Sequence, residues 1–517
     1  MSLAVLHSRT LVGIQTIPVR VEAFLSSGLP AFHIVGLPDS EVRESRERVR
    51  GALLCSGYDF PAGRLAVNLS PADIPKETGR LDLPIALAIL LASGQISVPE
   101  DRQRVTAQQD DVPLLKDCIL LGELSLTGAL MNCRGALPIA ISIFRQSPDA
   151  NVFMPHDSAL QAACVSHLNI YGAKSLREVA EHLCGNGRIQ RTPNRFPAPT
   201  DTSAAYPCMS DVKGQATAKL ALEVAAAGGH SLLMQGSPGV GKTMLAQRLP
   251  GIMPALSDEE RLDVMMVQSF QHKDVQTVCR PFRAPHHSCS VAALVGGGKQ
   301  MTLGEVSLAH QGILFLDELP EFSRQALEGL RQPIESRTVQ IARAAYRAEL
   351  PADFQLVAAM NPCPCGWFGH PEGRCRCSTE TVHRYLGKLS GPLMERIDMV
   401  VRLFSQSNDD SNPDELVEEP SKAYLDRVIK ARQRQLNRQG SLNARVADAG
   451  IAVHCRLSAM AHQRLKSVSR AFGLSNRSQA RIIRLARTLA DLADEDQLTE
   501  SCIAQAVQLR QEIKKPV

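Results

Sequence analysis

Residues 230–246 read HSLLMQGSPGVGKTMLA, and the rest of the chain is organised around this run. Its apolar first part predicts a buried strand, its glycine-rich middle predicts a loop, and the residues after Gly241 predict the start of a helix. A strand, a loop of the form G-x-x-x-x-G-K-S/T and a helix, in this order, are typical of a phosphate-binding loop. An ordinary glycine-rich turn would explain the glycines, but the strand, the spacing and the Lys-Thr pair all favour the phosphate loop.

The loop offers the groups that bind a nucleoside triphosphate and its magnesium ion. Its glycines let the backbone bend and turn N–H groups toward phosphate oxygens. The Lys242 ammonium can reach the β- and γ-phosphates, the Thr243 hydroxyl can ligate Mg²⁺, and the following helix adds the positive end of its dipole. ATP and Mg²⁺ are therefore the expected cofactors. The expected nucleotide contacts are Gly236, Ser237, Pro238, Gly239, Val240, Gly241, Lys242, Thr243 and Met244.

A second apolar run ends in two acids. Residues 312–319 read GILFLDEL, which predicts a buried strand of a parallel sheet with Asp317 and Glu318 at its carboxyl end. Asp317 can hold the Mg²⁺, and Glu318 can polarise the attacking water. A buried strand with a capping acid pair is the alternative, and the nearby phosphate loop favours the catalytic interpretation.

A third predicted strand covers Phe354–Met360 and is followed directly by Asn361. An amide at the tip of this strand could orient the lytic water against the γ-phosphate. Alternatively, Asn361 could form an Asx turn before Pro362, which the Asn-Pro pair favours. The residues alone leave both interpretations open.

Length and composition set limits on the whole chain. At 517 residues it is too long for a single core, so roughly two to four domains are expected. A net charge of +4 neither requires nor excludes a nucleic-acid partner. No apolar run reaches the length of a membrane span and the first residues have no signal-peptide pattern, so we expect a cytoplasmic protein without a membrane partner. Its 14 cysteines should then be reduced or bound to metal.

The sequence pattern divides the chain into three domains. Residues 1–187 indicate a mixed α/β domain whose early strand pattern includes the segment Thr10–Val21. Residues 188–210 are rich in proline and small polar residues and predict a linker. Residues 211–404 hold the nucleotide motifs, and residues 421–515 have a helical pattern with few glycines.

Four cysteines crowd one short loop within the core, residues 363–377. Four thiolates suit tetrahedral Zn²⁺. The spacing Cys-x-Cys is shorter by one residue than the usual Cys-x-x-Cys, and His370 could replace one thiol as a ligand. Reduced loop thiols without metal are the alternative. The expected zinc ligands are Cys363, Cys365, Cys375 and Cys377.

Two polar excursions interrupt the core, from Pro285 to Gln300 and from Thr338 to Leu350. The glycines from Gly296 onward and the alternating polar and apolar residues from Thr338 onward predict that the excursions form β-hairpins. Their basic residues Lys299, Arg343 and Arg347 could follow DNA phosphates without reading sequence. Ordinary surface hairpins are the alternative.

The first excursion also contains the adjacent pair His286 and His287. The pair could be taken for metal ligands. However, neighbours on an extended segment point to opposite sides, which strains ligation of one ion by both rings. We therefore expect a structural or DNA-proximal role.

Several stretches together resemble one family. They are GLPD at 36–39, NLSPADIPK at 68–76, RPFRAPHH at 280–287 and NPCPCG at 361–366, beside the two nucleotide motifs. This set is similar to the magnesium-chelatase-like AAA+ ATPases of the YifB/ComM group over nearly the whole chain. The resemblance implies an α/β protein with an N-terminal α+β domain similar to ribosomal protein S5 and Lon protease, an AAA+ parallel-sheet core and a C-terminal helical lid. The stretch that would carry a Lon-type nucleophile, residues 76–84, has no serine, so proteolysis is not expected.

The resemblance also implies roles for three residues. Asn361 would be sensor 1, Arg396 an arginine finger and Arg477, in the first turn of a predicted helix, sensor 2. Without the family, an Arg396–Asp398 surface pair would be favoured. A solvated basic face, shared by Arg481, Arg484 and Arg487 at a spacing of three, would be the alternative for the predicted helix.

At the level of function, the resemblance implies a homo-hexameric DNA motor. It would be a branch-migration helicase that acts on branched or single-stranded DNA during natural transformation, with recombination proteins as partners. In related ring ATPases such as replicative MCM helicases, hairpins at the two excursions face the pore. The alternative is an AAA+ protein remodeller similar to the ATPase subunit of magnesium chelatase, and the cysteine loop and basic excursions favour the DNA motor. A nucleotide-gated scaffold is a third, non-enzymatic interpretation.

Overall fold

The phosphate-loop strand β10 (Leu232–Gly236) lies inside a five-stranded parallel sheet, in the order β11-β14-β17-β10-β18. Residues of β10, β14 (Ile313–Leu316) and β17 (Gln355–Met360) are buried throughout, as expected for a parallel sheet covered on both faces. The outer strands are β11 (Phe282–Arg283) and β18 (Met399–Leu403). Because the strands are parallel, their carboxyl ends share one edge, and that edge carries all three predicted nucleotide motifs.

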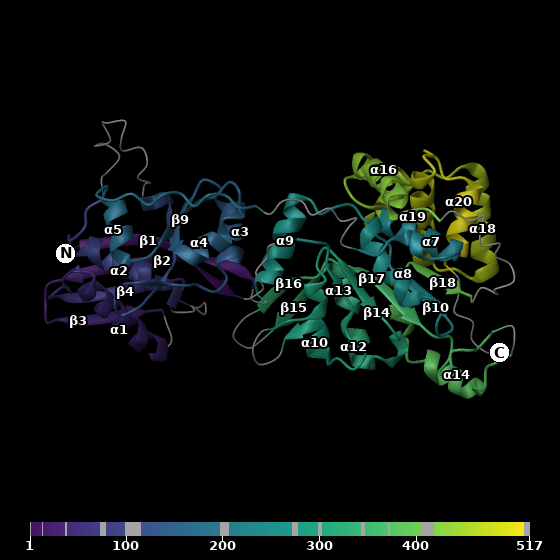
Figure 1. The fold of residues 1–517 in the computed structure, drawn as a ribbon, viewed down its shortest axis with the longest axis horizontal. Helices are drawn as coiled ribbons and strands as arrows, with labels where there is room; N and C mark the ends of the chain where they lie inside the picture. Colours follow the sequence, from purple (N-terminus) through teal and green to yellow (C-terminus); the bar gives the residue numbers. More distant parts are fainter. Residues whose placement is uncertain are drawn as a thin grey trace. The chain divides into compact units, whose positions relative to one another are not determined.

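The computed structural model describes residues 2–12, 14–36, 39–72, 79–98, 115–196, 206–270, 278–297, 302–342, 347–370, 373–404 and 418–510. Contacts divide the chain into two units. The first comprises Met1–Ala198, Met265–Thr277 and Gln340–Glu349, and the second comprises Pro199–Val264, Val278–Val339 and Leu350–Val517. Figure 1 labels many of the elements of the two units. Among the described residues, no helix combines the length and the apolar character that crossing a membrane requires.

In the second unit, helices from the end of the chain share one core with the parallel sheet. Helix α7 (Ala216–Gly228) packs against both α16 (Ser421–Gln439) and α19 (Asn476–Leu492), which gather beside it in Figure 1. Buried Leu232 of the sheet and Leu485 of α19 belong to the same apolar cluster. The other C-terminal helices are α17 (Asp448–His454), α18 (Ala459–Phe472) and α20 (Glu500–Gln508). The C-terminal helices are therefore docked on the sheet rather than set apart from it.

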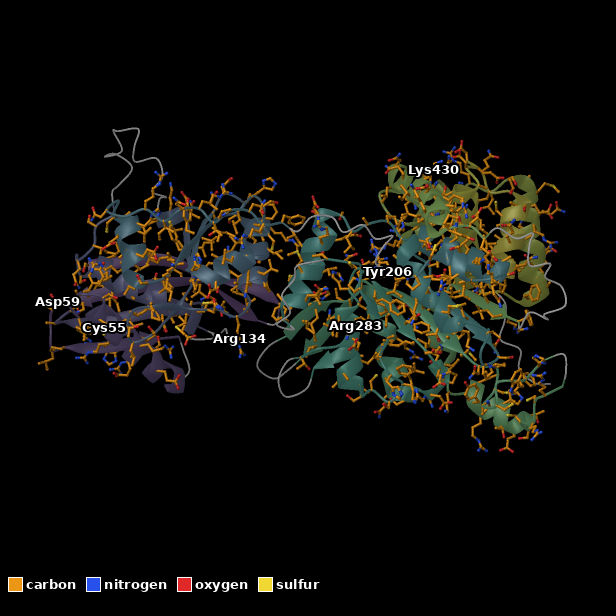
Figure 2. All side chains as sticks on the ribbon, in the orientation of Figure 1. Cys55, Asp59, Arg134, Tyr206, Arg283 and Lys430 are labelled. Atoms are coloured by element: carbon orange, nitrogen blue, oxygen red, sulfur yellow. The ribbon has the colours of Figure 1, made fainter. Side chains whose placement is uncertain are left out.

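Both predicted polar excursions contain paired strands. The first holds β12 (Gly296–Gly297) and β13 (Thr302–Leu303), and the second holds β15 (Thr338–Ala342) and β16 (Arg347–Pro351). Arg283 of β11, labelled in Figure 2, lies just before the first excursion and donates two hydrogen bonds of 2.7 Å to the Glu305 carboxylate just after it. The other described helices between residues 242 and 394 are α8 (Lys242–Arg248), α9 (Asp258–Ser269), α10 (Val291–Val295), α11 (Glu305–Leu308), α12 (Arg324–Gly329), α13 (Arg331–Ser336), α14 (Thr379–Leu386) and α15 (Gly391–Met394).

The first unit is built on a seven-stranded mixed sheet, in the order β3-β4-β2-β1-β5-β8-β9. Its strands are β1 (Ser2–Val12), β2 (Gln15–Ser26), β3 (Ala31–Val35), β4 (Arg64–Ser70), β5 (Cys118–Leu120), β8 (Asn151–Pro155) and β9 (Asn169–Ala173), beside the small pair β6 (Glu123–Leu124) and β7 (Leu130–Met131). Its helices are α1 (Asp39–Cys55), α2 (Asp82–Ala92), α3 (Ala136–Gln146), α4 (His156–Ala162) and α5 (Leu176–Leu183). Helix α2 is apolar on all sides and packs on β1 and β2, as its uninterrupted hydrophobic run predicts.

The strand segment predicted over Thr10–Val21 needs a correction. The chain reverses between Val12 and Gln15, which pair with each other, so the segment belongs to two antiparallel strands. The segment is rich in β-branched and apolar residues on both sides of the reversal, so composition alone predicts strand throughout.

Candidate nucleotide site and cysteine cluster

The phosphate loop joins β10 to α8 in a shape that depends on its glycines. Gly239 and Gly241 have φ angles of 80° and 88°, in the left-handed region where a Cβ atom is disfavoured. At Gly236 the constraint is space, because an added Cβ would lie 2.9 Å from the Leu403 carbonyl oxygen of the neighbouring strand. Helix α8 then begins at Lys242, so the free N–H groups of its first turn lie at the loop.

Lys242 is buried at the point where the loop and β17 meet. Its ammonium donates hydrogen bonds to the Gly236 carbonyl (2.8 Å), the Ser237 carbonyl (2.9 Å) and the Asn361 side-chain oxygen (3.0 Å). Burial lowers the pKa of Lys242, and the nearby carboxylates of Asp317 and Glu318 act in the opposite direction. Lys242 and Asn361 are 119 residues apart in the sequence, and the folded structure brings their side chains into contact.

The Asx-turn alternative for Asn361 is not what the structure shows. Its side-chain oxygen accepts the Lys242 ammonium across the sheet instead. This is possible because β17 pairs directly with β10, so that the residue after one strand lies beside the loop after the other. The amide is therefore at the tip of the strand that borders the phosphate loop.

Thr243 and Asp317 form the expected oxygen pair. The Thr243 hydroxyl donates to an Asp317 carboxylate oxygen at 2.6 Å, and the second oxygen accepts from the Glu318 N–H at 2.9 Å. A hydroxyl and a carboxylate side by side at a phosphate loop are the hard oxygen ligands that Mg²⁺ takes in proteins. The donor set therefore fits a magnesium ion held between this pair and a phosphate.

Glu318 has an unexpected neighbour. Its backbone has φ 52°, in the left-handed region, and its half-exposed carboxylate lies 3.2 Å from the His287 ring nitrogen Nδ1. The prediction that the rings of His286 and His287 point to opposite sides is wrong, since a turn brings their centroids within 4.1 Å. The RPFRAPHH stretch marked this histidine pair, but nothing in the sequence indicated its contact with Glu318.

The two predicted arginines both lie near Glu335, and their described contacts do not include the phosphate loop. An Arg396 guanidinium nitrogen lies 3.0 Å from the Glu335 carboxylate, and another donates to the Pro392 carbonyl at 2.7 Å. The more exposed Arg477 lies 3.9 Å from the same Glu335. The alternative Arg396–Asp398 surface pair is not formed; Asp398 accepts hydrogen bonds from the Ser231 N–H and hydroxyl.

The alternative of a solvated basic face on α19 is also wrong. Arg481, Arg484 and Arg487 are largely buried, with side chains 11%, 14% and 1% exposed, and each faces an acid. Their partners are Asp398, Asp448 and Asp491, respectively. Arg484 and Arg487 fasten the helical region internally, and Arg481 ties α19 to the residue before β18.

Of the three predicted DNA contacts, Lys299 and Arg343 lie outside the described residues. Arg347 is the first residue of β16, where the structure describes the backbone and not its side chain. The three residues remain a prediction from the sequence.

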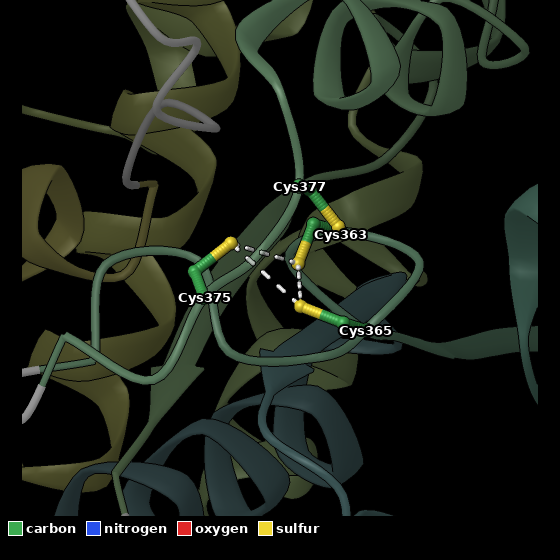
Figure 3. Close-up of side chains that lie close together, drawn as sticks. All are labelled: Cys363, Cys365, Cys375 and Cys377. Carbon is green, nitrogen blue, oxygen red and sulfur yellow. Dashed lines mark hydrogen bonds between the residues drawn. The ribbon is translucent and has the colours of Figure 1, made fainter.

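The four loop cysteines converge. Figure 3 shows their thiols turned toward a common centre, and their sulfur atoms all lie within 4.8 Å of one another. The Cys363 sulfur lies 3.3 Å from that of Cys365 and 3.8 Å from that of Cys375, and the last two are 3.7 Å apart. A tetrahedral zinc with Zn–S bonds of about 2.3 Å places its sulfur ligands about 3.8 Å apart, so the group fits Zn²⁺.

The chemistry of these thiols agrees with that fit. Against the effect of burial, the N–H groups of Arg376 and Trp367 lower the pKa of Cys365 to about 6, whereas burial and the neighbouring thiols raise the pKa of Cys375 to about 12. Such a group can be fully ionised only when a cation offsets the repulsion among thiolates. The ring of His370, the substitute ligand considered from sequence, lies edge-on against Trp367 at 5.1 Å.

Comparisons with known proteins cover nearly the whole chain. Family models described as subunit ChlI of Mg-chelatase, magnesium chelatase subunit ChlI, and the ChlI C-terminal region match residues 21–158, 208–411 and 418–510. The protein YifB of Salmonella typhimurium is 41% identical over 99% of this chain and 97% of its own length. The competence protein ComM of Haemophilus influenzae is 40% identical over 99% of this chain and 98% of its own. The DNA replication licensing factor Mcm6 of Drosophila melanogaster is 30% identical over 20% of this chain and 12% of its own length.

Proposed function

The chain belongs to the magnesium-chelatase ChlI-like family that includes YifB and ComM, and on that premise we propose that it is an ATP-driven motor that moves branched DNA. Membership of this family implies ATP and Mg²⁺ as cofactors. The observation that carries the proposal is the meeting of Lys242, Asn361, Thr243 and Asp317 at one edge of the parallel sheet. These are the groups that phosphoryl transfer needs in one place.

Each residue has a defined task in the proposed hydrolysis. Lys242 and the loop N–H groups would hold the phosphates, and Thr243 and Asp317 would hold Mg²⁺, which would supply positive charge for the phosphates. Glu318 accepts a proton from the attacking water, and Asn361 orients that water. Since the barrier is lowered by positioning and charge, the contacts among these side chains matter more than any single group.

We also propose that Arg396 completes the site of a neighbouring subunit in a hexameric ring, and that Arg477 senses the nucleotide. The support for a role of Arg396 in a neighbouring subunit is that, within its own chain, its described contacts are to Glu335 and Pro392 and not to the phosphate loop. A finger supplied by a neighbour would couple hydrolysis in one subunit to movement of the next.

DNA is proposed as the substrate from two likenesses. One relative is named a competence protein, and 20% of this chain is similar to a protein named a replication licensing factor. We propose branch migration of recombination intermediates during natural transformation, with recombination proteins as partners. Lys299, Arg343 and Arg347 would contact DNA phosphates. The N-terminal unit would have the fold shared by ribosomal protein S5 and Lon protease and serve assembly or DNA handling.

A synthetic four-way junction tests this function. Wild-type protein should bind the junction, hydrolyse ATP faster in its presence and convert it to duplex products. Lys242→Ala should abolish both turnover and conversion, because the phosphates lose their buried cation. The matched control is Lys430→Ala, which removes an exposed lysine of α16 and should leave both unchanged.

Two results would overturn the proposal. If the junction neither binds nor raises turnover, the protein remodeller similar to the magnesium chelatase ATPase subunit becomes the better interpretation. If assembled wild-type protein hydrolyses no ATP with or without DNA, the motor itself is excluded and a nucleotide-gated scaffold remains.

A further inference from the structure

The cysteine loop touches the nucleotide site at two points. Its first cysteine, Cys363, comes two residues after Asn361, whose side chain contacts Lys242. Its turn residue, Gly366, packs directly on Pro238 of the phosphate loop, so closely that a Cβ atom at Gly366 would lie 2.4 Å from the Pro238 ring carbon Cδ. The loop therefore borders both the residue proposed to orient water and the loop proposed to hold phosphate.

The described part of this loop has no regular secondary structure and is held by short turns and by the contacts of its thiols. Between β17 and α14, the described residues form turns and bends and contain no helix or strand. Cys363 is fully buried, and its sulfur accepts the Phe368 N–H at 3.3 Å. Trp367 carries the guanidinium of Arg374 over its ring at 5.1 Å. The backbone hydrogen bonds described within the loop are local turn bonds, such as that from the Gly366 N–H to the Cys363 carbonyl at 2.9 Å, so a cross-link between its two ends would add to its order.

We propose that Zn²⁺ bound by the four cysteines is a structural cofactor of the ATP site, and that it fixes Asn361 and Pro238 by locking the loop between them. Binding of one ion by four thiolates closes the loop on itself, and the free energy of metal binding becomes stability of this local structure. The Gly366–Pro238 contact then transmits that stability to the phosphate loop. This inference rests on the proposed ATPase function for its consequence, but the metal site stands independently.

Metal analysis tests the site itself. Full-length protein purified without chelators or added metal should hold about one zinc per chain. Cys375→Ser should lose the zinc, whereas Cys55→Ser, which changes an exposed cysteine outside the cluster, should keep it. Less than half an equivalent of zinc in the wild type, or iron in its place, would overturn the assignment.

A pair of glycine variants tests the link to the ATP site. Gly366 and Gly369 have similar left-handed φ angles, 82° and 77°, but an added Cβ at Gly369 meets nothing within 4 Å. Both variants therefore carry the same backbone strain, and only Gly366→Ala pushes on Pro238. Gly366→Ala should lower ATP turnover by roughly tenfold to a hundredfold, whereas Gly369→Ala should keep most of it. Circular dichroism and zinc content should be those of the wild type in both.

The outcomes separate this inference from the proposed function. Equal turnover in the two glycine variants would overturn the link between loop and phosphate site, even if zinc is bound. Loss of turnover on removing zinc from wild-type protein, with recovery when zinc is returned, would support it. A wild type that binds zinc but never hydrolyses ATP would instead contradict the proposed ATPase.

Discussion

Among single residues, Glu318 combines a left-handed backbone with a carboxylate held against His287. A non-glycine residue keeps such a conformation only where its surroundings impose it, and strain of this kind is concentrated at functional sites. The Glu318 side chain is half-exposed, so burial alone would not fix its orientation. The 3.2 Å contact with the His287 nitrogen holds its carboxylate in one orientation. We infer that His287 is a positioning residue for the proposed general base.

His287→Ala should lower kcat for ATP by roughly tenfold, less than the roughly hundredfold or more that a general base contributes in full, because Glu318 stays in place but loses its partner. The KM for ATP should change little, since His287 is not among the phosphate contacts. His287→Asn, whose amide can take the place of Nδ1, should restore part of kcat. Steady-state ATPase assays measure both constants.

The neighbouring histidine provides the control. The His286 ring nitrogen faces the Ser288 hydroxyl at 2.8 Å, so His286→Ala removes a ring of the same kind without freeing Glu318. A rise in KM with unchanged kcat in His287→Ala, or equal losses in the two alanine variants, would contradict the positioning role.

Between elements, the start of α16 is docked on the beginning of the ATPase core. The Ser421 hydroxyl accepts the Met209 N–H at 2.7 Å, and the Cys208 sulfur accepts the Ser421 N–H at 3.4 Å. The hydrogen bond from the Ser210 hydroxyl, followed by the Ser421 N–H at the helix N-terminus, lowers the pKa of Cys208 to about 6. The same hydrogen bonds thus join two elements and stabilise a thiolate.

Alkylation of Cys208 should report this joint. At pH 7 its thiol should react with iodoacetamide faster than the exposed Cys55, and its rate should fall as the pH drops through about 6. A pKa lowered by folding also means that this group's stabilising contribution is fully present above the unfolded thiol pKa and is lost as the pH falls through about 6. Peptide mass spectrometry resolves the labelled positions.

Ser210→Ala removes the largest contribution to the shift and should move the midpoint of the Cys208 rate profile upward. Ser501→Ala, a change on the exposed side of α20, should not move it. A wild-type midpoint near the ordinary thiol value would show that the helix start does not stabilise the thiolate.

At the scale of the whole molecule, the proposed ring requires that two subunits build one site. Lys242→Ala and Arg396→Ala should each abolish hydrolysis alone, the first in its own site and the second in its neighbour's. Mixed at equal amounts, they should recover roughly a quarter of the wild-type rate, the fraction of head-to-tail interfaces that pair an intact phosphate loop with an intact Arg396. ATPase assays after co-assembly measure this recovery.

A double variant provides the control for mixing. Lys242→Ala mixed with a chain carrying both Lys242→Ala and Arg396→Ala should stay inactive, because no intact phosphate loop is present. Arg384→Ala, which removes an exposed arginine paired with Glu380, should remain active alone. No recovery in the first mixture would place Arg396 in its own chain's site or outside catalysis.

Local patterns in the sequence determined the elements that carry the site. The phosphate loop, the acid pair after Leu316 and the strand before Asn361 were predicted within a residue or two of their observed bounds. This works because each depends on neighbours along the chain: apolar runs make strands, and glycines allow the turn. The crowding of four cysteines likewise predicted their convergence, since a short loop cannot separate them far.

Only the tertiary structure decided which distant side chains meet. The order of β14, β17 and β10 places Asn361 on Lys242 and rules out the Asx turn, and a turn in another segment brings His287 to Glu318. Burial turned the arginines of α19 from a predicted surface face into internal ion pairs. These outcomes depend on packing between segments far apart in sequence, and such contacts leave no periodic or local trace in the chain itself.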